Sequence, residues 1–235
     1  MSVPELLTLI RLSSRIGRDL NLVQAGGGNT SVKDGETLWI KASGKWLVHA
    51  GHDDMFVPVP MADIRRNLST GNEKFPEYAT NSGVLLRPSV ETAMHAVLPQ
   101  RIVIHVHSVA AISWAAQNGG EHPLKERLAG LRWGWIPYIH PGVPLAVRIQ
   151  QELDARPDVL LLGNHGLVVA AEGFESAETL LTEVETRLAS HPRSAPEPQL
   201  QALEELARES DWTPAEEPEV HALATDLRSA AIASG

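Results

Sequence analysis

Residues 101–109 read RIVIHVHSV, a run of mostly β-branched residues that carries two histidines. Such a run is typical of a buried β-strand. Side chains at positions i and i+2 of a strand point to the same face, so His105 and His107 are expected to lie side by side. The stretch therefore predicts a core strand that presents two imidazoles to one side. The pair is either a chance surface feature or part of a metal site.

Helical and extended patterns alternate on both sides of this strand. Ser89 is the expected N-cap of the helix that precedes it. Residues 49–82 are expected to be irregular, apart from a short helix. The expected helices are 4–18, 61–69, 89–98, 110–117, 144–154 and 174–189, and the expected strands are 30–33, 37–42, 101–107, 135–139, 159–162 and 167–171. This order favours an α/β sandwich over a strict βαβ repeat.

Composition excludes several classes of protein. The chain of 235 residues contains no cysteine, so disulfides and thiolate metal ligands are excluded. No apolar run reaches about 18 residues, so no membrane span is expected. The formal net charge of −9 argues against a nucleic-acid partner. The N-terminus lacks the basic start and cleavage site of a signal peptide, so the expected location is the cytoplasm.

A proline-rich stretch, HPRSAPEPQ at 191–199, separates a body from a tail. The tail, 191–235, holds nine acidic and three basic side chains, a balance of −6. The body, 1–190, holds the remaining 20 acidic and 17 basic side chains, a balance of −3. We therefore expect one globular domain over 1–190 and an acidic helical extension over 191–235, with helices near 199–209 and 218–233.

Three further segments carry residues suited to chemistry, and each also has an ordinary explanation. AGGGNTS at 25–31 could form an anion-binding nest or a tight turn. KASGK at 41–45 could offer a hydroxyl and positive charge to an anion, or it could be a solvated hairpin turn. RPSVETAMH at 87–95 places Glu91 and His95 one turn apart, which a plain capped helix also explains.

GNHG at 163–166 interrupts an apolar run with a histidine. Burying an imidazole without a partner costs free energy, so packing alone gives little reason for His165. Three neutral imidazoles with an open fourth position are the ligand set of a catalytic zinc site. The alternative is that the histidines are unrelated surface residues.

Six segments, in the order in which they occur, resemble the class II aldolase/adducin family. They are GGGNTS, ASG, RPSVETAMH, HVHS, IPYIHPG and GNHG. The resemblance covers about residues 5–190 and is strongest to the aldolase part of rhamnulose-1-phosphate aldolase/dehydrogenase proteins. Fuculose-1-phosphate aldolase is more distantly similar. The family resemblance implies a three-layer α/β/α sandwich with a central, mainly antiparallel sheet, usually assembled as a homotetramer.

The resemblance also implies roles for individual residues. Glu91 would be the catalytic acid/base, and the metal ligands would be His105, His107 and His165, with Zn²⁺ as the expected ion and other divalent metals as alternatives. The residues that would hold the substrate phosphate are Gly28, Asn29, Ser31, Ser43, Gly44 and Ser89.

The implied activity is that of a metal-dependent aldolase-type lyase. It would cleave or form a C–C bond in a ketose phosphate or related hydroxycarbonyl compound, through a metal-stabilised enediolate. One alternative is a sugar-phosphate epimerase or dehydratase of the same family, and another is a non-catalytic, adducin-like assembly domain. Val90 stands where the family often has serine, and Tyr78 and Tyr138 are the only tyrosines. The tail therefore carries no tyrosine to act as a proton donor, and the substrate stays open.

Overall fold

In the computed structural model, the chain divides into two compact units, residues 1–189 and 190–235. The structure describes residues 2–117, 119–152, 154, 156–190 and 200–208, together with Ser210, Asp211, Thr213, Ala215, Glu216, Val220, His221, Asp226 and Arg228.

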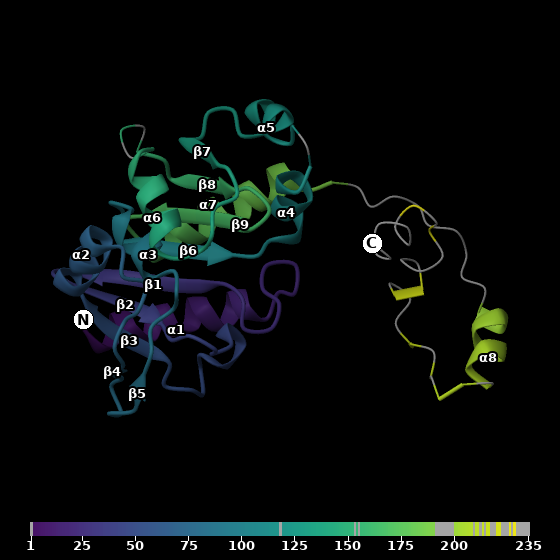
Figure 1. Ribbon diagram of the computed structural model, residues 1–235, viewed down its shortest axis with the longest axis horizontal. Helices are drawn as coiled ribbons and strands as arrows, with labels where there is room; N and C mark the ends of the chain where they lie inside the picture. Colours follow the sequence, from purple (N-terminus) through teal and green to yellow (C-terminus); the bar gives the residue numbers. More distant parts are fainter. Residues whose placement is uncertain are drawn as a thin grey trace. The chain divides into compact units, whose positions relative to one another are not determined.

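A seven-stranded sheet forms the centre of the first unit (Figure 1). Its strands are β1 (Asn29–Asp34), β2 (Thr37–Lys41), β3 (Phe56–Pro60), β6 (Ile102–Val106), β7 (Trp133–Ile136), β8 (Val159–Leu162) and β9 (Gly166–Ala171). Their spatial order is β3-β2-β1-β6-β9-β8-β7. Every neighbouring pair is antiparallel except β7 and β8. The histidine-bearing strand β6 is therefore the middle strand, with three strands on each side.

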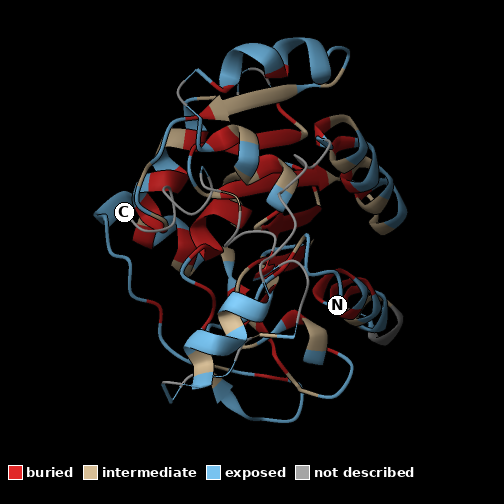
Figure 2. Cartoon of the chain, turned by 90° about the vertical axis from the view of Figure 1, so that its right-hand side faces the viewer, coloured by how far each residue is buried: buried red, intermediate tan, exposed pale blue. Residues whose placement is uncertain are grey.

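Helices cover both faces of this sheet. One face packs against α1 (Val3–Gly17), α4 (Val109–Ala115), α5 (Glu121–Arg127) and α7 (Phe174–Leu188). The other face packs against α2 (Met61–Thr70), α3 (Thr92–Val97) and α6 (Val143–Gln150). Figure 2 shows most of the sheet buried between helices whose outer sides are exposed. The expected three-layer α/β/α sandwich with a mainly antiparallel sheet is thus confirmed.

The pleat of β6 decides which way its histidine points. Ile102, Ile104 and Val106 pack into the core cluster that contains residues of α1 and α7, whereas Val103 packs into the cluster that contains residues of α3 and α6. His105 shares the face of Val103, so the strand presents its ring toward α3. Each fully buried aliphatic side chain contributes about 1.5–3 kcal/mol, so the strand is anchored on both faces.

Several elements differ from the sequence-based expectation. β3 lies inside the stretch expected to be irregular; its prolines are tolerated because it is an edge strand. Helix α5 was not expected. The strand expected at 135–139 is β7, which ends at Ile136, directly before Pro137, a residue that has no backbone N–H for a strand ladder. Short elements complete the unit: the 3₁₀ turn Leu47–His49 and a two-stranded sheet of β4 (Tyr78–Ala79) and β5 (Leu85–Leu86).

Helix α3 begins later than expected. Its N-cap is Glu91, not Ser89. The hydroxyl oxygen of Ser89 accepts a hydrogen bond from the backbone N–H of Glu91 at 3.2 Å, and its carbonyl accepts from the backbone of Thr92 at 3.1 Å. Ser89 therefore closes a turn before the helix, and this turn places Glu91 at the helix entrance, opposite β6.

The second unit contains helix α8 (Leu200–Arg208), in agreement with the helix expected near 199–209. The proline-rich stretch at 191–199 and most of the helix expected at 218–233 lie outside the described residues. Among the described residues, no helix is both long enough and apolar enough to cross a membrane.

Candidate active site

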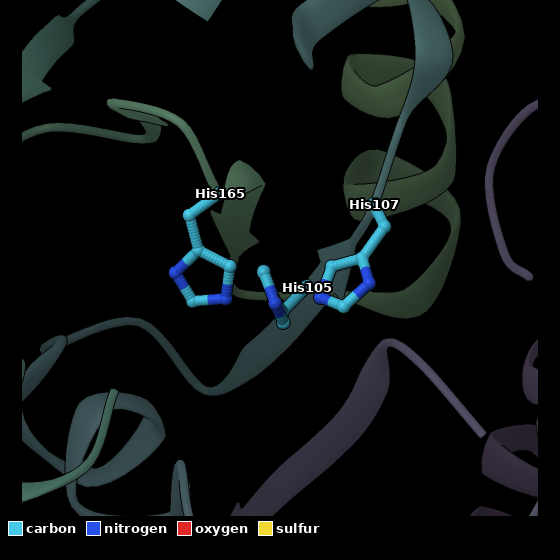
Figure 3. Close-up of side chains that lie close together, drawn as sticks. All are labelled: His105, His107 and His165. Carbon is cyan, nitrogen blue, oxygen red and sulfur yellow. The ribbon is translucent and has the colours of Figure 1, made fainter. Parts of the chain in front are cut away.

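Three imidazoles singled out by the sequence lie together (Figure 3). The ligand atoms of His105, His107 and His165 all lie within 4.8 Å of one another, and the ring centroids are 4.9–5.5 Å apart. His105 lies near the end of β6 and His107 directly follows that strand. His165 lies in the turn between β8 and β9. Because β6 and β9 are antiparallel neighbours, this turn lies beside the end of β6.

The ring of His105 is fully buried, and a main-chain acceptor sets its tautomer. Its Nδ1 lies 3.0 Å from the carbonyl oxygen of Leu167, which can only accept, so Nδ1 carries the proton. Burial disfavours the charged ring and lowers the pKa of His105 to about 4. The ring is therefore neutral, and its Nε2 has a bare lone pair. Among the described residues, nothing donates to that atom.

The carboxylate of Glu91 faces the same point. Its Oε2 lies 3.4 Å from Nε2 of His105, and its Oε1 lies 3.2 Å from Nε2 of His165. Burial acts to raise the pKa of Glu91, but the neighbouring rings of His105 and His165 and the amide of Asn29 hold it below its usual range. Oε1 has no hydrogen-bond partner within the described part of the chain.

Two buried acceptor atoms, Oε1 of Glu91 and Nε2 of His105, thus point to one place without a donor between them. Leaving such atoms unpaired is costly, and a cation among them removes the cost. Imidazole nitrogens with one carboxylate oxygen are a ligand set that suits Zn²⁺ and similar divalent ions. The residues present therefore fit the metal that the family resemblance implies.

The three histidines and Glu91 lie at a cavity of about 230 Å³. Its walls are formed by the glycine loop 26–28, Asn29, Lys41, Ser43, Gly44, Ser89, Val90, Glu91, His107, Pro141 and His165. His105 lies beneath this surface. The structure therefore brings most of the residues expected to bind substrate to a single cavity above the histidines.

The glycine loop approaches the histidines so closely that only glycine fits at two positions. A Cβ on Gly27 would lie 2.6 Å from Nδ1 of His107. A Cβ on Gly28 would lie 2.9 Å from the carbonyl oxygen of His105, and the φ of Gly28 is +65°, a conformation that disfavours side chains. The loop is therefore packed directly against the strand end that carries both imidazoles.

Ser31 is the one expected phosphate-binding residue that does not line the cavity. It is fully buried, and its Oγ lies 2.7 Å from Nδ1 of His95. Ser31 shares a strand face with Asn29, but it lies one pleat further into the core, where helix α3 covers it. We therefore assign its hydroxyl to His95 instead of to a substrate phosphate.

Two buried groups at the site were not among the expected site residues. Lys41 lines the cavity, and its Nζ donates to the carbonyl oxygens of Gly26 at 2.9 Å and Lys45 at 2.6 Å. Burial lowers the pKa of Lys41 to about 8. His95 lies beneath Asn29. Sequence signals existed for both: Lys41 lies two residues before Ser43, and His95 follows Glu91 by four residues, about one helical turn.

Neither tyrosine of the chain lines the cavity. The hydroxyl of Tyr78 donates to Oδ2 of Asp63 at 2.9 Å, and burial together with that carboxylate raises the pKa of Tyr78 above its ordinary value. Tyr138 is 61% exposed. Glu91 is therefore the only carboxylate or phenol on the described cavity wall.

One curated relative matches part of the chain. The "Uncharacterized oxidoreductase YuxG" of Bacillus subtilis (strain 168) is 31% identical over 72% of this chain. The match covers 27% of that relative, so the chain spans about a quarter of the length of the curated protein that it matches.

Solved structures share the fold. The N-terminal class II aldolase domain of a conserved protein from Thermoplasma acidophilum superposes with a TM-score of 0.65 at 25% identity, covering 80% of this chain and 93% of that one. L-fuculose-1-phosphate aldolase from Thermus thermophilus gives a TM-score of 0.53 at 19% identity, covering 89% and 99%.

The family model named "Class II Aldolase and Adducin N-terminal domain" matches residues 8–190 of the chain. This range contains every strand of the sheet and every residue of the candidate site. The family expected from the sequence is thereby confirmed: the chain belongs to the class II aldolase and adducin N-terminal domain family.

Proposed function

We propose that residues 1–190 form a divalent-metal-dependent aldolase-type lyase, with 191–235 as an appended acidic segment. It would cleave or form a C–C bond in a ketose phosphate or related hydroxycarbonyl compound. The observation that carries this proposal is the convergence of three imidazoles and one carboxylate at the floor of a polar cavity. Within the described part of the chain, buried acceptor atoms face each other there without a donor, which favours a metal centre over a structural cluster.

In this proposal His105, His107 and His165 hold the metal, with Zn²⁺ as the preferred ion. When bound, the metal supplies Lewis-acid polarisation of a substrate carbonyl and its neighbouring hydroxyl. Burial lowers the pKa of His105 and of His107, which favours the neutral imidazole that a metal needs. The carbonyl of Leu167 orients the ring of His105, a contact of the kind that fixes metal-ligating histidines.

Glu91 is the proposed group that moves the proton. Asn29 Nδ2 donates to its Oε2 at 2.7 Å, which fixes the carboxylate and leaves Oε1 without a partner among the described residues. Its lowered pKa keeps it ionised at neutral pH, so it begins as a base. It would take a proton from a substrate hydroxyl during cleavage and return it to carbon.

The remaining polar wall of the cavity would hold the non-reacting end of the substrate. Gly28 and Gly44 have positive φ in two separate turns, one before β1 and one after β2, and Ser43 and Ser89 each offer a hydroxyl. The ammonium group of Lys41 supplies positive charge behind them. Such a wall suits a phosphate or another anionic group, whose binding would position the reacting carbon over the metal.

We also propose a cytoplasmic homotetramer with a small-molecule substrate and neither nucleic-acid nor membrane partners. Three aliphatic residues that precede Glu91 by one to seven positions are exposed. The exposed fractions are 51% for Val84, 61% for Leu85 and 60% for Val90. A subunit interface would bury such residues. Light scattering on the purified protein measures the number of subunits directly.

A panel of ketose 1-phosphates and pentulose phosphates, assayed with and without chelator, tests the reaction. Release of dihydroxyacetone phosphate or another C–C fragment, lost with chelator, is the expected result. An isomerised or dehydrated product without fragments would contradict lyase action and favour the epimerase or dehydratase alternative. Purified protein that holds no metal and takes none up would contradict all enzymatic alternatives and leave the adducin-like assembly domain.

A further inference from the structure

His95 is a buried histidine that the proposed chemistry does not use. It lies on α3 one turn after Glu91, to whose carbonyl oxygen its backbone N–H donates at 3.2 Å. Its Nδ1 lies 2.7 Å from Oγ of Ser31, and its Nε2 contacts Oδ1 of Asn29. Both ring nitrogens of His95 therefore contact side chains of β1. Asn29 and Ser31 can reach them together because they lie on the same face of that strand.

The directions of these hydrogen bonds follow from Glu91. A carboxylate only accepts, so the amide nitrogen of Asn29, 2.7 Å from Oε2 of Glu91, must be the donor. The amide oxygen of Asn29 therefore faces His95 and accepts from Nε2, which must carry the ring proton. Burial keeps the ring neutral by lowering the pKa of His95 to about 3. Nδ1 then accepts from the hydroxyl of Ser31.

Ser89 connects this hydrogen-bond network to the cavity. The amide nitrogen of Asn29 donates to Oγ of Ser89 at 3.2 Å, and the backbone N–H of Glu91 donates to the same oxygen at 3.2 Å. Both acceptor positions of this hydroxyl are then occupied. Its own hydrogen is left to point elsewhere, and Ser89 lines the cavity.

We propose that His95 is a positioning residue that orients the Asn29 side chain and so leaves Ser89 to donate its hydroxyl hydrogen into the cavity. The wall at this point then presents a donor. It favours a substrate group that can only accept, such as a phosphate or carboxylate oxygen, over a hydroxyl or amine. The kinetic part of this inference rests on the proposed function, whereas the direction of the hydrogen bonds does not.

The tautomer of His95 tests the inference without any substrate. Protein labelled with ¹⁵N-histidine and carrying its bound metal would be sedimented and examined by solid-state NMR. The variant H95Q identifies the His95 signals by their loss. We expect a proton on Nε2 and a bare Nδ1 at neutral pH. A ring protonated at Nδ1, or at both nitrogens, would overturn the inference.

Two variants test the positioning role. In H95Q the side-chain amide nitrogen lies close to the position of Nε2 and can still donate to Asn29. H95F has a similar size and no donor, so it leaves the buried amide oxygen of Asn29 unpaired. With a cleaved substrate in hand, we expect kcat to fall about tenfold in H95F and to be largely retained in H95Q. Thermal unfolding of both variants checks that they fold.

Equal losses of kcat in two folded variants would overturn the positioning role while leaving the lyase proposal intact. If the wild-type protein cleaves no member of the panel, the proposed function fails on its own, and the tautomer still decides the hydrogen-bond direction. Should H95F not fold, the tautomer measurement on wild-type protein remains decisive, because it needs only the H95Q variant for assignment.

Discussion

Replacing Glu91 by glutamine removes one negative charge and keeps the size of the side chain. In the structure, Oε2 of Glu91 accepts from Asn29 at 2.7 Å, and the amide oxygen of a glutamine can accept the same bond. The new NH₂ group would then lie where Oε1 now faces Nε2 of His165 at 3.2 Å. The fold should therefore persist, while the group that accepts a proton is lost.

The expected loss of turnover can be bounded. General acid–base catalysis typically contributes a factor of about 10²–10⁴, or about 2.7–5.4 kcal/mol of barrier. Glu91 is the only carboxylate on the described cavity wall, so no neighbour there can take over. We expect kcat to fall by this factor in E91Q, with metal content unchanged because His105, His107 and His165 remain.

The assay is release of a C–C cleavage fragment at saturating substrate, together with elemental analysis of the same samples. E77Q, at an exposed glutamate, is the matched control and should behave as wild type. Undiminished turnover in E91Q would remove Glu91 from the mechanism. Loss of metal together with turnover would show instead that the carboxylate is needed to hold the ion.

Four further predictions follow from other contacts. G28A should be less stable in chemical unfolding than G35A, because both have positive φ (+65° and +57°) but only Gly28 has a backbone oxygen 2.9 Å from the added Cβ; equal losses would refute this. H165A should lose bound metal in elemental analysis, whereas H140A, at an exposed histidine, should keep it. Burial lowers the pKa of Lys41 from 10.5 to about 8, so the unfolded chain binds more protons between these values. Wild-type stability relative to K41M should therefore rise across that range in urea unfolding, and a flat difference would contradict it. Residues 1–190 alone should unfold at the same temperature as the full chain, because the compact unit 1–189 holds the whole sheet; a clear drop would show that the tail supports it.

Much of the candidate site follows from local patterns. The i, i+2 spacing of His105 and His107 and the glycine-framed His165 indicated the ligand group before any contact was known. The strand and helix patterns predicted most elements of the sandwich, because each needs only the periodicity of its own segment. Strand β3 was not predicted, because its two prolines are unfavourable inside a strand and only its position at the sheet edge makes them acceptable.

The sequence by itself therefore determined the family, the layered architecture and which imidazoles gather. The tertiary structure alone decided what each polar group faces. Ser31 forms a hydrogen bond with His95, 64 positions away along the chain, and Lys41 donates one to the carbonyl oxygen of Gly26. The physical reason is sheet register: the pairing of β1 with β6 sets Asn29 opposite His105 and puts helix α3 over Ser31. A local sequence pattern cannot predict a contact between residues so far apart in the chain.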